Sequence, residues 1–203
     1  MMAKGSTRNP EAYQLYLKGN YYAAKYTRDS LQKGIDYFNQ AIAADPNFAL
    51  AHNGLAYYYI AANEYTLAPK DSMPKARDEA TRALQIDDGL ADAHCSLGNV
   101  AAWYDWDWSK AETEFKRAIE LDPNSARNHQ YYGWYLVTLG RYDEGISECE
   151  RARSLDPTSA EVNMYLGGAL VLSHRPDQAI EQLGKTIDLD PTYWLAHDFL
   201  GRA

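Results

Sequence analysis

One short motif recurs five times along the chain and limits the fold more strongly than any other feature of the sequence. Each copy runs from a small residue through a largely aliphatic stretch to Asp-Pro, or to Asp-Asp in the second copy. The copies end at positions 46, 88, 123, 157 and 191, so the intervals between successive copies are 42, 35, 34 and 34. A regular interval of about this length predicts equivalent structural repeats that stack in a row.

The residues that lead into each motif predict an amphipathic helix. Three residues, most of them small or apolar, follow one another at spacings of four and three, which places all three on one helical face. These triplets are Gly34–Phe38–Ala41, Ala76–Ala80–Ala83, Ala111–Phe115–Ala118, Gly145–Cys149–Ala152 and Ala179–Leu183–Thr186. Ser109, Asp143 and Asp177 are expected to start three of these helices, Ser109 through a capping box with Glu112. Asp-Pro is expected to end them, because proline cannot continue a helix.

The first half of each repeat is predicted to be helical too. Position one of this helix is taken by Ala49, Ala91, Ala126, Ala160 and Trp194. Positions seven, eight and eleven then repeat a large, a small and an apolar residue, which again share one face. Position four holds His52, His94, His129, Asn163 and His197.

This two-helix pattern resembles the tetratricopeptide repeat (TPR), with its Leu-Gly pair, its Ala and Phe on the second helix, and its closing Pro. The resemblance covers about residues 11–203. It implies an all-α fold, an α-solenoid in which antiparallel helix pairs stack into a right-handed superhelix. First helices would line its concave side.

The period sets the expected domain bounds. Residues 11–203 are expected to form a single solenoid, with residues 1–10 a disordered segment or a leader added to the chain. The expected repeats and terminal helix are 11–48, 49–90, 91–125, 126–159, 160–193 and 194–203. Extra residues near 27–29, 65–72 and 104–108 lie between the two helices of a repeat, so they are expected to lengthen those turns.

Two local segments carry a narrower resemblance. Residues 9–19 (NPEAYQLYLKG) and the turn 104–108 (YDWDW) resemble repeat segments attached to bacterial multi-domain signalling and regulatory proteins. For the 104–108 turn two interpretations stand, an exposed aromatic contact point or a turn whose Trp rings pack on adjacent helices.

Composition argues against several classes of partner and compartment. With 20 Lys+Arg against 28 Asp+Glu the net charge is −8, and the longest basic run is two residues, so nucleic acid is not an expected partner. No stretch approaches the roughly 20 apolar residues of a membrane span, and the N-terminus lacks the apolar core of a signal peptide. The two cysteines are too few for a disulfide framework, which favours a cytoplasmic location.

No catalytic, cofactor or metal site is predicted. The chain has no G-x-S-x-G, no phosphate-binding Gly-rich loop and no H-E-x-x-H motif. The position-four histidines would lie on successive helices about 8–10 Å apart, too far to share one ion, so they are interpreted as packing residues.

The candidate binding residues come from the groove-facing positions that the TPR resemblance implies. They are Tyr16, Asn20, Asn53, Tyr57, Asn99, Trp103, Arg127, Gln130, Trp134 and Met164. Asn can pair with peptide backbone, and Trp and Tyr are frequent hot-spot residues. Packing within the repeat remains the alternative role for Trp103 and Trp134. The Lys positions of the clamp that holds chaperone C-terminal tails are absent, so binding of such tails is not expected.

The resulting hypothesis is a non-catalytic scaffold that binds a peptide or helix of a protein partner, as a module of a bacterial regulatory protein. The alternatives are a self-assembly or spacer element between effector domains and, more weakly, a small-ligand sensor. Residues 194–203 lack a second helix and are largely apolar, so a second copy of the chain is a further candidate partner at that end.

Overall fold

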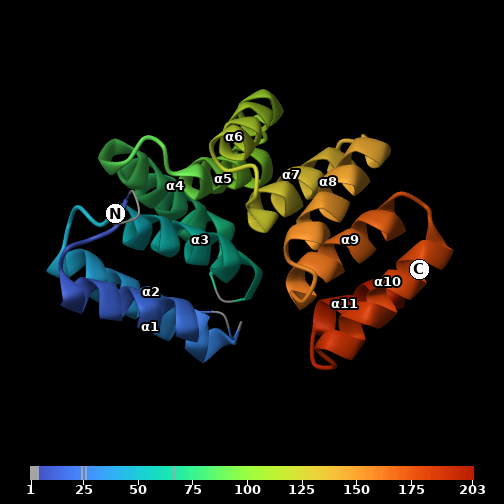
Figure 1. The fold of residues 1–203 in the computed structure, drawn as a ribbon, viewed down its shortest axis with the longest axis horizontal. Coiled ribbons are helices and arrows are strands. Elements are labelled where there is room, and N and C mark those ends of the chain that lie inside the picture. The colour runs from blue at the N-terminus through green and yellow to red at the C-terminus, as the bar shows by residue number, and fades with distance from the viewer. Residues whose placement is uncertain (1–4, 24, 26, 66) are drawn as a thin grey trace. The chain divides into compact units, whose positions relative to one another are not determined.

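A computed structural model describes residues 5–203 except 24, 26 and 66. It divides into two compact units, Met1–Leu121 and Asp122–Ala203, which we call the N-terminal and C-terminal units. The N-terminal unit contains α1 (Pro10–Ala23), α2 (Arg28–Ala44), α3 (Ala49–Tyr65), α4 (Pro69–Ile86), α5 (Ala91–Val100), the π-helix η1 (Ala101–Asp105) and α6 (Trp108–Leu121) (Figure 1). The C-terminal unit contains α7 (Ala126–Thr138), α8 (Tyr142–Leu155), α9 (Ala160–Leu172), α10 (Pro176–Leu189) and α11 (Trp194–Leu200). All regular structure in the described residues is helical.

Helices pair in chain order within each unit. In the N-terminal unit α1 packs on α2, α3 on α4 and α5 on α6, and α2 and α4 also pack on the first helix that follows each of them. The C-terminal unit repeats this order with α7 on α8, α9 on α10, and α11 against both α9 and α10. The predicted all-α solenoid of stacked helix pairs is thereby confirmed.

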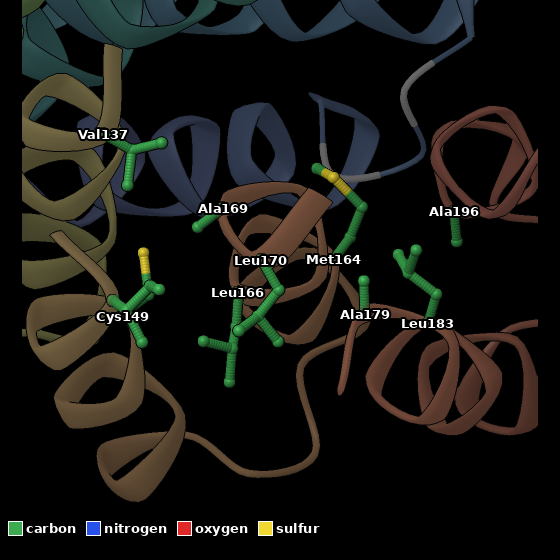
Figure 2. Close-up of a cluster of buried hydrophobic side chains, with 10 residues drawn as sticks. Val137, Cys149, Met164, Leu166, Ala169, Leu170, Ala179, Leu183 and Ala196 are labelled. Carbon is green, nitrogen blue, oxygen red and sulfur yellow. The ribbon is translucent and has the colours of Figure 1, made fainter. Parts of the chain in front are cut away.

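Small residues let neighbouring helices approach closely, both within a repeat and between repeats. A Cβ atom at Gly54 would lie 2.7 Å from the ring of Phe38, whose side chain is fully buried. At Gly133 a Cβ atom would lie 2.7 Å from the carbonyl oxygen of Gly145, so α7 and α8 touch backbone to backbone. Side chains of α7 to α11 then meet in one apolar cluster that includes Cys149, Leu166 and Leu183 (Figure 2).

The turns between repeats are all four residues long. They span residues 45–48, 87–90, 122–125, 156–159 and 190–193. In four of them the first Asp accepts a hydrogen bond from the backbone N–H two residues later, at 2.9–3.1 Å, which closes a tight Asx turn. The Asp of the motif therefore fixes the turn as well as the helix end.

The predicted helix starts need correction. Helix α6 begins at Trp108, and Asp107 caps it by accepting a hydrogen bond from the Lys110 N–H at 3.0 Å. Ser109 lies inside the first turn, so the predicted Ser109 capping box is wrong. Asp143 and Asp177 likewise fall in the first turns of α8 and α10 rather than before them. Carboxylates there still favour the helix, because they face the positive end of its dipole.

Two of the insertions lie where predicted but do not lengthen a loop. Helices α3 and α4 have 17 and 18 residues, against 13 and 14 for α7 and α8, so much of the insertion at 65–72 extends helices. The single extra residue near 104–108 is taken up by η1, since a π-turn accommodates one more residue than an α-turn.

The part of the leader that the structure describes lies against the first inter-repeat turn. Thr7 Oγ1 donates to the Asp45 carboxylate, and Asn9 Nδ2 donates to the Ala44 carbonyl oxygen at 2.9 Å. The proposed bounds, a leader of residues 1–10 followed by one solenoid, remain a prediction.

Candidate functional site

Three of the N-terminal candidates are buried inside their unit. Asn53, Tyr57 and Asn99 are buried. Asn53 Oδ1 accepts a hydrogen bond from Ser96 Oγ at 3.0 Å, which links α3 to α5. Asn99 Oδ1 accepts one from Trp103 Nε1 at 3.2 Å. These amides therefore already have partners and present little surface to a ligand.

The remaining N-terminal candidates are half-buried. The ring of Tyr16 lies 5.8 Å from Phe38 and 5.1 Å from Phe48, and its neighbour one turn on, Asn20, is partly exposed. Trp103 packs edge-on against Trp108 at 6.3 Å. Each keeps some accessible surface, and Tyr16 and Trp103 also take part in the packing of their unit.

In the C-terminal unit the candidates separate by burial. Gln130 and Met164 are buried, and Gln130 Nε2 donates to Glu161 Oε1 at 3.2 Å. Arg127 and Trp134 both retain accessible surface. The idea that all ten candidates line a groove remains a prediction, with Arg127 and Trp134 the C-terminal members that a ligand could reach.

Trp134 belongs to a continuous set of half-buried rings, which we call the aromatic row. Its members are Tyr131, Trp134, Tyr165 and Phe199, from the first helices α7, α9 and α11. Ring centroids lie 5.7 Å apart for Tyr131–Tyr165, 5.3 Å for Trp134–Tyr165 and 5.9 Å for Trp134–Phe199, all edge to face. The rings cross α9 at Gly168, where a Cβ atom would lie 3.1 Å from Trp134 and 3.3 Å from Phe199.

Sequence reasoning missed three members of this row. Tyr131, Tyr165 and Phe199 occupy position six of successive first helices, each one repeat period after the last. This spacing is itself a signal, because equivalent positions of stacked repeats lie side by side. The groove positions taken from the TPR resemblance did not include position six.

The 104–108 turn combines features of both interpretations. Trp103 and Trp108 pack together, and Asp105 forms an ion pair with Arg77. Trp106, however, is 66% exposed and touches only the edge of the cluster, 5.5 Å from Trp108. Its φ of 56° is left-handed, which is uncommon for a bulky residue and marks local strain.

Three of the four position-four histidines, His52, His94 and His129, link the second helix of their repeat to the turn that precedes their own helix. Nδ1 pairs with a second-helix carboxylate at 2.5–2.7 Å in the pairs His52–Glu79, His94–Glu114 and His129–Glu148. Nε2 faces a carbonyl of the preceding turn, at 3.1 Å for Pro46 and 3.0 Å for Pro123. The hydrogen bond to Glu148 raises the pKa of His129, although burial opposes the rise. Within the part of the chain that the structure describes, no three His, Cys, Asp or Glu side chains cluster as metal ligands.

Both cysteines are buried, and neither forms a disulfide. Burial raises the pKa of the Cys149 thiol to about 12, with smaller contributions from Glu148 and Glu150. A nucleophilic cysteine needs a depressed pKa and access, so this environment favours a packing role.

Comparison with known proteins places this arrangement in a family. The paired helices and their stacked first-helix faces define a helical-repeat scaffold for protein–protein interaction. Three tetratricopeptide repeat family models match residues 22–91, 114–147 and 136–197. The chain belongs to the tetratricopeptide repeat family.

Among curated proteins, the chain is similar to transcriptional regulator HilA of Salmonella typhimurium strain LT2 and of Salmonella paratyphi A. Identity is 29% over 143 residues, which is 68% of this chain and 26% of each regulator. The chain thus spans about a quarter of the length of these relatives.

Among solved structures, TTC0263, a thermophilic TPR protein of Thermus thermophilus, shares 16% identity at a TM-score of 0.77, covering 94% of this chain and 98% of that chain. YrrB, described as a TPR protein with an unusual peptide-binding site, shares 23% identity at 0.54, covering 92% and 90%. PilF of Pseudomonas aeruginosa shares 25% identity at 0.63, covering 77% and 67%. No helix in the described residues is both long and apolar enough to span a membrane.

Proposed function

We propose that the protein is a non-catalytic scaffold that binds a peptide or helical segment of a partner protein along its first helices. The observation that carries this proposal is the aromatic row of the C-terminal unit. Its four rings are connected edge to face and all keep exposed surface. Rigid, half-exposed aromatic residues give large contact area for a small loss of side-chain entropy, which is why they dominate binding hot spots.

Polar groups on the same helices complement the row. Arg127 lies one turn before Tyr131 on α7, and Glu161 lies one turn before Tyr165 on α9. A peptide lying across α7 and α9 would therefore meet aromatic surface flanked by one cation and one carboxylate. Of the predicted residues, those with accessible surface would contact the peptide, and the buried ones would support them. The accessible residues are Tyr16, Asn20, Trp103, Arg127 and Trp134.

The relatives support a biological setting for this binding. The similarity to HilA, a transcriptional regulator, supports a role as the interaction module of a bacterial regulatory protein. YrrB carries a peptide-binding site, which supports a peptide as ligand. A cytoplasmic location suits such a regulator, since neither cysteine forms a disulfide.

A peptide-display experiment tests the proposal. A random peptide library is selected on the purified chain, and the enriched peptides are titrated against Trp134→Ala, Trp134→Phe and Tyr142→Ala. Tyr142 is a large exposed ring on the second helix α8, 38% exposed, and serves as the matched control.

We expect Trp134→Ala to weaken binding about tenfold or more, Trp134→Phe to weaken it less, and Tyr142→Ala to leave it unchanged. Circular dichroism shows whether each variant keeps its helices. Equal affinity for wild type and for a folded Trp134→Ala variant would refute the aromatic row as the binding surface.

Self-assembly is the second candidate, and a specific observation favours it. Trp194, the first residue of α11, is 56% exposed, and Leu189 at the end of α10 is 45% exposed. Light scattering over a concentration series separates the two roles. A mass that rises with concentration and falls back in Trp194→Ala supports assembly through this end, and a constant monomer mass rejects it.

A further inference from the structure

Three departures from the repeat pattern meet at one place in the C-terminal unit. The residue after the last small residue of the second-helix triplet is aliphatic in four repeats, as Ile42, Leu84, Ile119 and Ile187, but is Arg153 in the fourth repeat. In the fifth repeat Asn163 replaces the position-four histidine. Gln182 replaces the glutamate that pairs with that histidine elsewhere.

These three side chains form a hydrogen-bonded series. Arg153 Nη1 donates to Gln182 Oε1 at 3.1 Å, and Gln182 Nε2 donates to Asn163 Oδ1 at 2.8 Å. Asn163 Nδ2 donates in turn to the Pro157 carbonyl at 3.0 Å, so it reaches its own turn as the histidines do. Asn163 and Gln182 are buried, whereas Arg153 is only half-buried. The buried pair is therefore satisfied and uncharged, and the guanidinium above it uses one of its five donor hydrogens in this series.

An open cleft of about 550 Å³ lies over this series, between α8 and α10. It is lined by Arg153, Ser154, Pro157, Asn163, Lys185, Asp188 and Leu189. Its volume is in the range that small ligands and short peptide segments occupy.

The charges around the cleft favour an anion. Arg153 and Lys185 contribute two cations to the lining and Asp188 one carboxylate. Glu181 pairs with Lys185 at 2.7 Å but is exposed, and such surface pairs are weak. In the second, third and fourth repeats a glutamate of the His–Glu pair occupies the place of Gln182. Replacement of that glutamate by an amide removes a negative charge from beneath Arg153.

We propose that this cleft binds a carboxylate of an acidic peptide, held by the Arg153 guanidinium and the Lys185 ammonium. The planar guanidinium can engage both carboxylate oxygens, and the apolar stems of Lys185 and Leu189 cover the peptide chain beside it. None of the residues that line the cleft belongs to the aromatic row, so the inference does not depend on that row.

Titration followed by NMR of the Arg Nε–Hε signals tests the proposal. The probes are an acetylated and amidated tetraglutamate peptide, a tetraalanine peptide with a free C-terminus, and glutarate as a free dicarboxylate. A saturable shift of the Arg153 signal is expected with the first probe. A larger shift with the tetraalanine peptide would mean that the cleft binds a C-terminal carboxylate, and a shift with glutarate alone would mean that it binds a free dicarboxylate. Either result would overturn the proposal that the ligand is an acidic side chain of a peptide.

Two variants distinguish a specific binding site at Arg153 from a nonspecific attraction to the positive charge of α8. Arg153→Ile restores the aliphatic residue of the other repeats, and Arg151→Ile removes the same charge from the exposed face of α8, where Arg151 contacts Asn124 at 3.3 Å. We expect Arg153→Ile to weaken binding about tenfold or more and Arg151→Ile to leave it nearly unchanged. Equal loss in both variants, or no saturable shift with any probe, would overturn the proposal.

A third variant controls for folding. Asn163→His combined with Gln182→Glu rebuilds the His–Glu pair of the preceding repeat and returns a carboxylate beneath Arg153. This double variant is expected to keep its thermal stability while it loses carboxylate binding. If the double variant binds the peptide as tightly as wild type, the uncharged Asn163–Gln182 pair beneath Arg153 has no role in binding and the proposal fails.

Discussion

The substitution Gly145→Ala tests whether α7 and α8 touch through their backbones. An added Cβ atom would lie 2.5 Å from Val137 Cγ2 and 2.6 Å from the Gly133 carbonyl oxygen. Ordinary contacts of a Cβ atom begin near 3.4 Å, so the two helices must separate by most of an ångström. A backbone carbonyl cannot rotate away as a side chain can, which places the cost at the upper end of the range of about 1–3 kcal/mol for overpacking.

The gain in helix propensity offsets only part of that cost. Alanine is favoured over glycine inside a helix by about 1 kcal/mol, so a net loss of about 2 kcal/mol is expected. For a chain of this size that corresponds to a fall in Tm of about 4–8 °C. Hydrogen exchange should show the loss of protection concentrated in α7 and α8, because each repeat contacts mainly its neighbours.

Gly184→Ala is the matched control. Gly184 lies inside α10, and no atom would come within 4 Å of an added Cβ. The same substitution is therefore expected to raise Tm, through a gain of about 0.5–1 kcal/mol. Thermal melts of both variants by circular dichroism decide the matter. A Gly145→Ala variant that melts with or above the wild type would contradict the close approach of the two helices.

Three further predictions concern single side chains. The pKa of His129 is raised in the fold, so protonated His129 stabilises the native state fully below about pH 6 and loses this contribution as the pH rises past the raised pKa. A double variant, His129→Asn with Glu148→Gln, lacks this contribution. The difference in Tm between wild type and the double variant should therefore shrink between about pH 5.5 and about pH 9. The buried Cys149 thiol, with its pKa near 12, should react with iodoacetamide only when denaturant opens the unit, and fast native alkylation would contradict its burial. Ser125→Ala removes the cap on the Asn128 N–H, a bond of 3.3 Å, and should cost about 1 kcal/mol in urea unfolding.

Much of the fold could be predicted from the sequence because the same helix pattern recurs in every repeat. The regular period and the small residues at fixed spacing predict which faces meet, and the structure confirms the stacked pairs. A structural feature that occurs in only one repeat is harder to predict. The sequence shows one extra residue near Tyr104, but whether a π-turn or a loop absorbs it depends on the packing of both neighbouring helices.

The candidate site was less accessible to sequence reasoning. Position in a helix tells which way a side chain points, but not how near the next helix lies. Ser96 on α5 lies close enough to α3 to donate a hydrogen bond to Asn53, so Asn53 is a buried partner of Ser96 and not a free groove residue. The aromatic row, by contrast, was present in the sequence as three rings spaced by one repeat period.

The two kinds of turn differ in how much variation they accept. Turns between repeats always have four residues, and in all five of them a position-four side chain forms a hydrogen bond with a carbonyl of the turn and ties it to the next first helix. The extra residues of the second and third repeats instead lie between the turns, where they extend α3 and α4 or form η1. Additional residues can therefore be inserted between the two helices of a repeat without disturbing the turns between repeats. A recognition loop grafted at residues 139–141 would leave the stacking alone, whereas one residue added at 156–159 would rotate everything that follows.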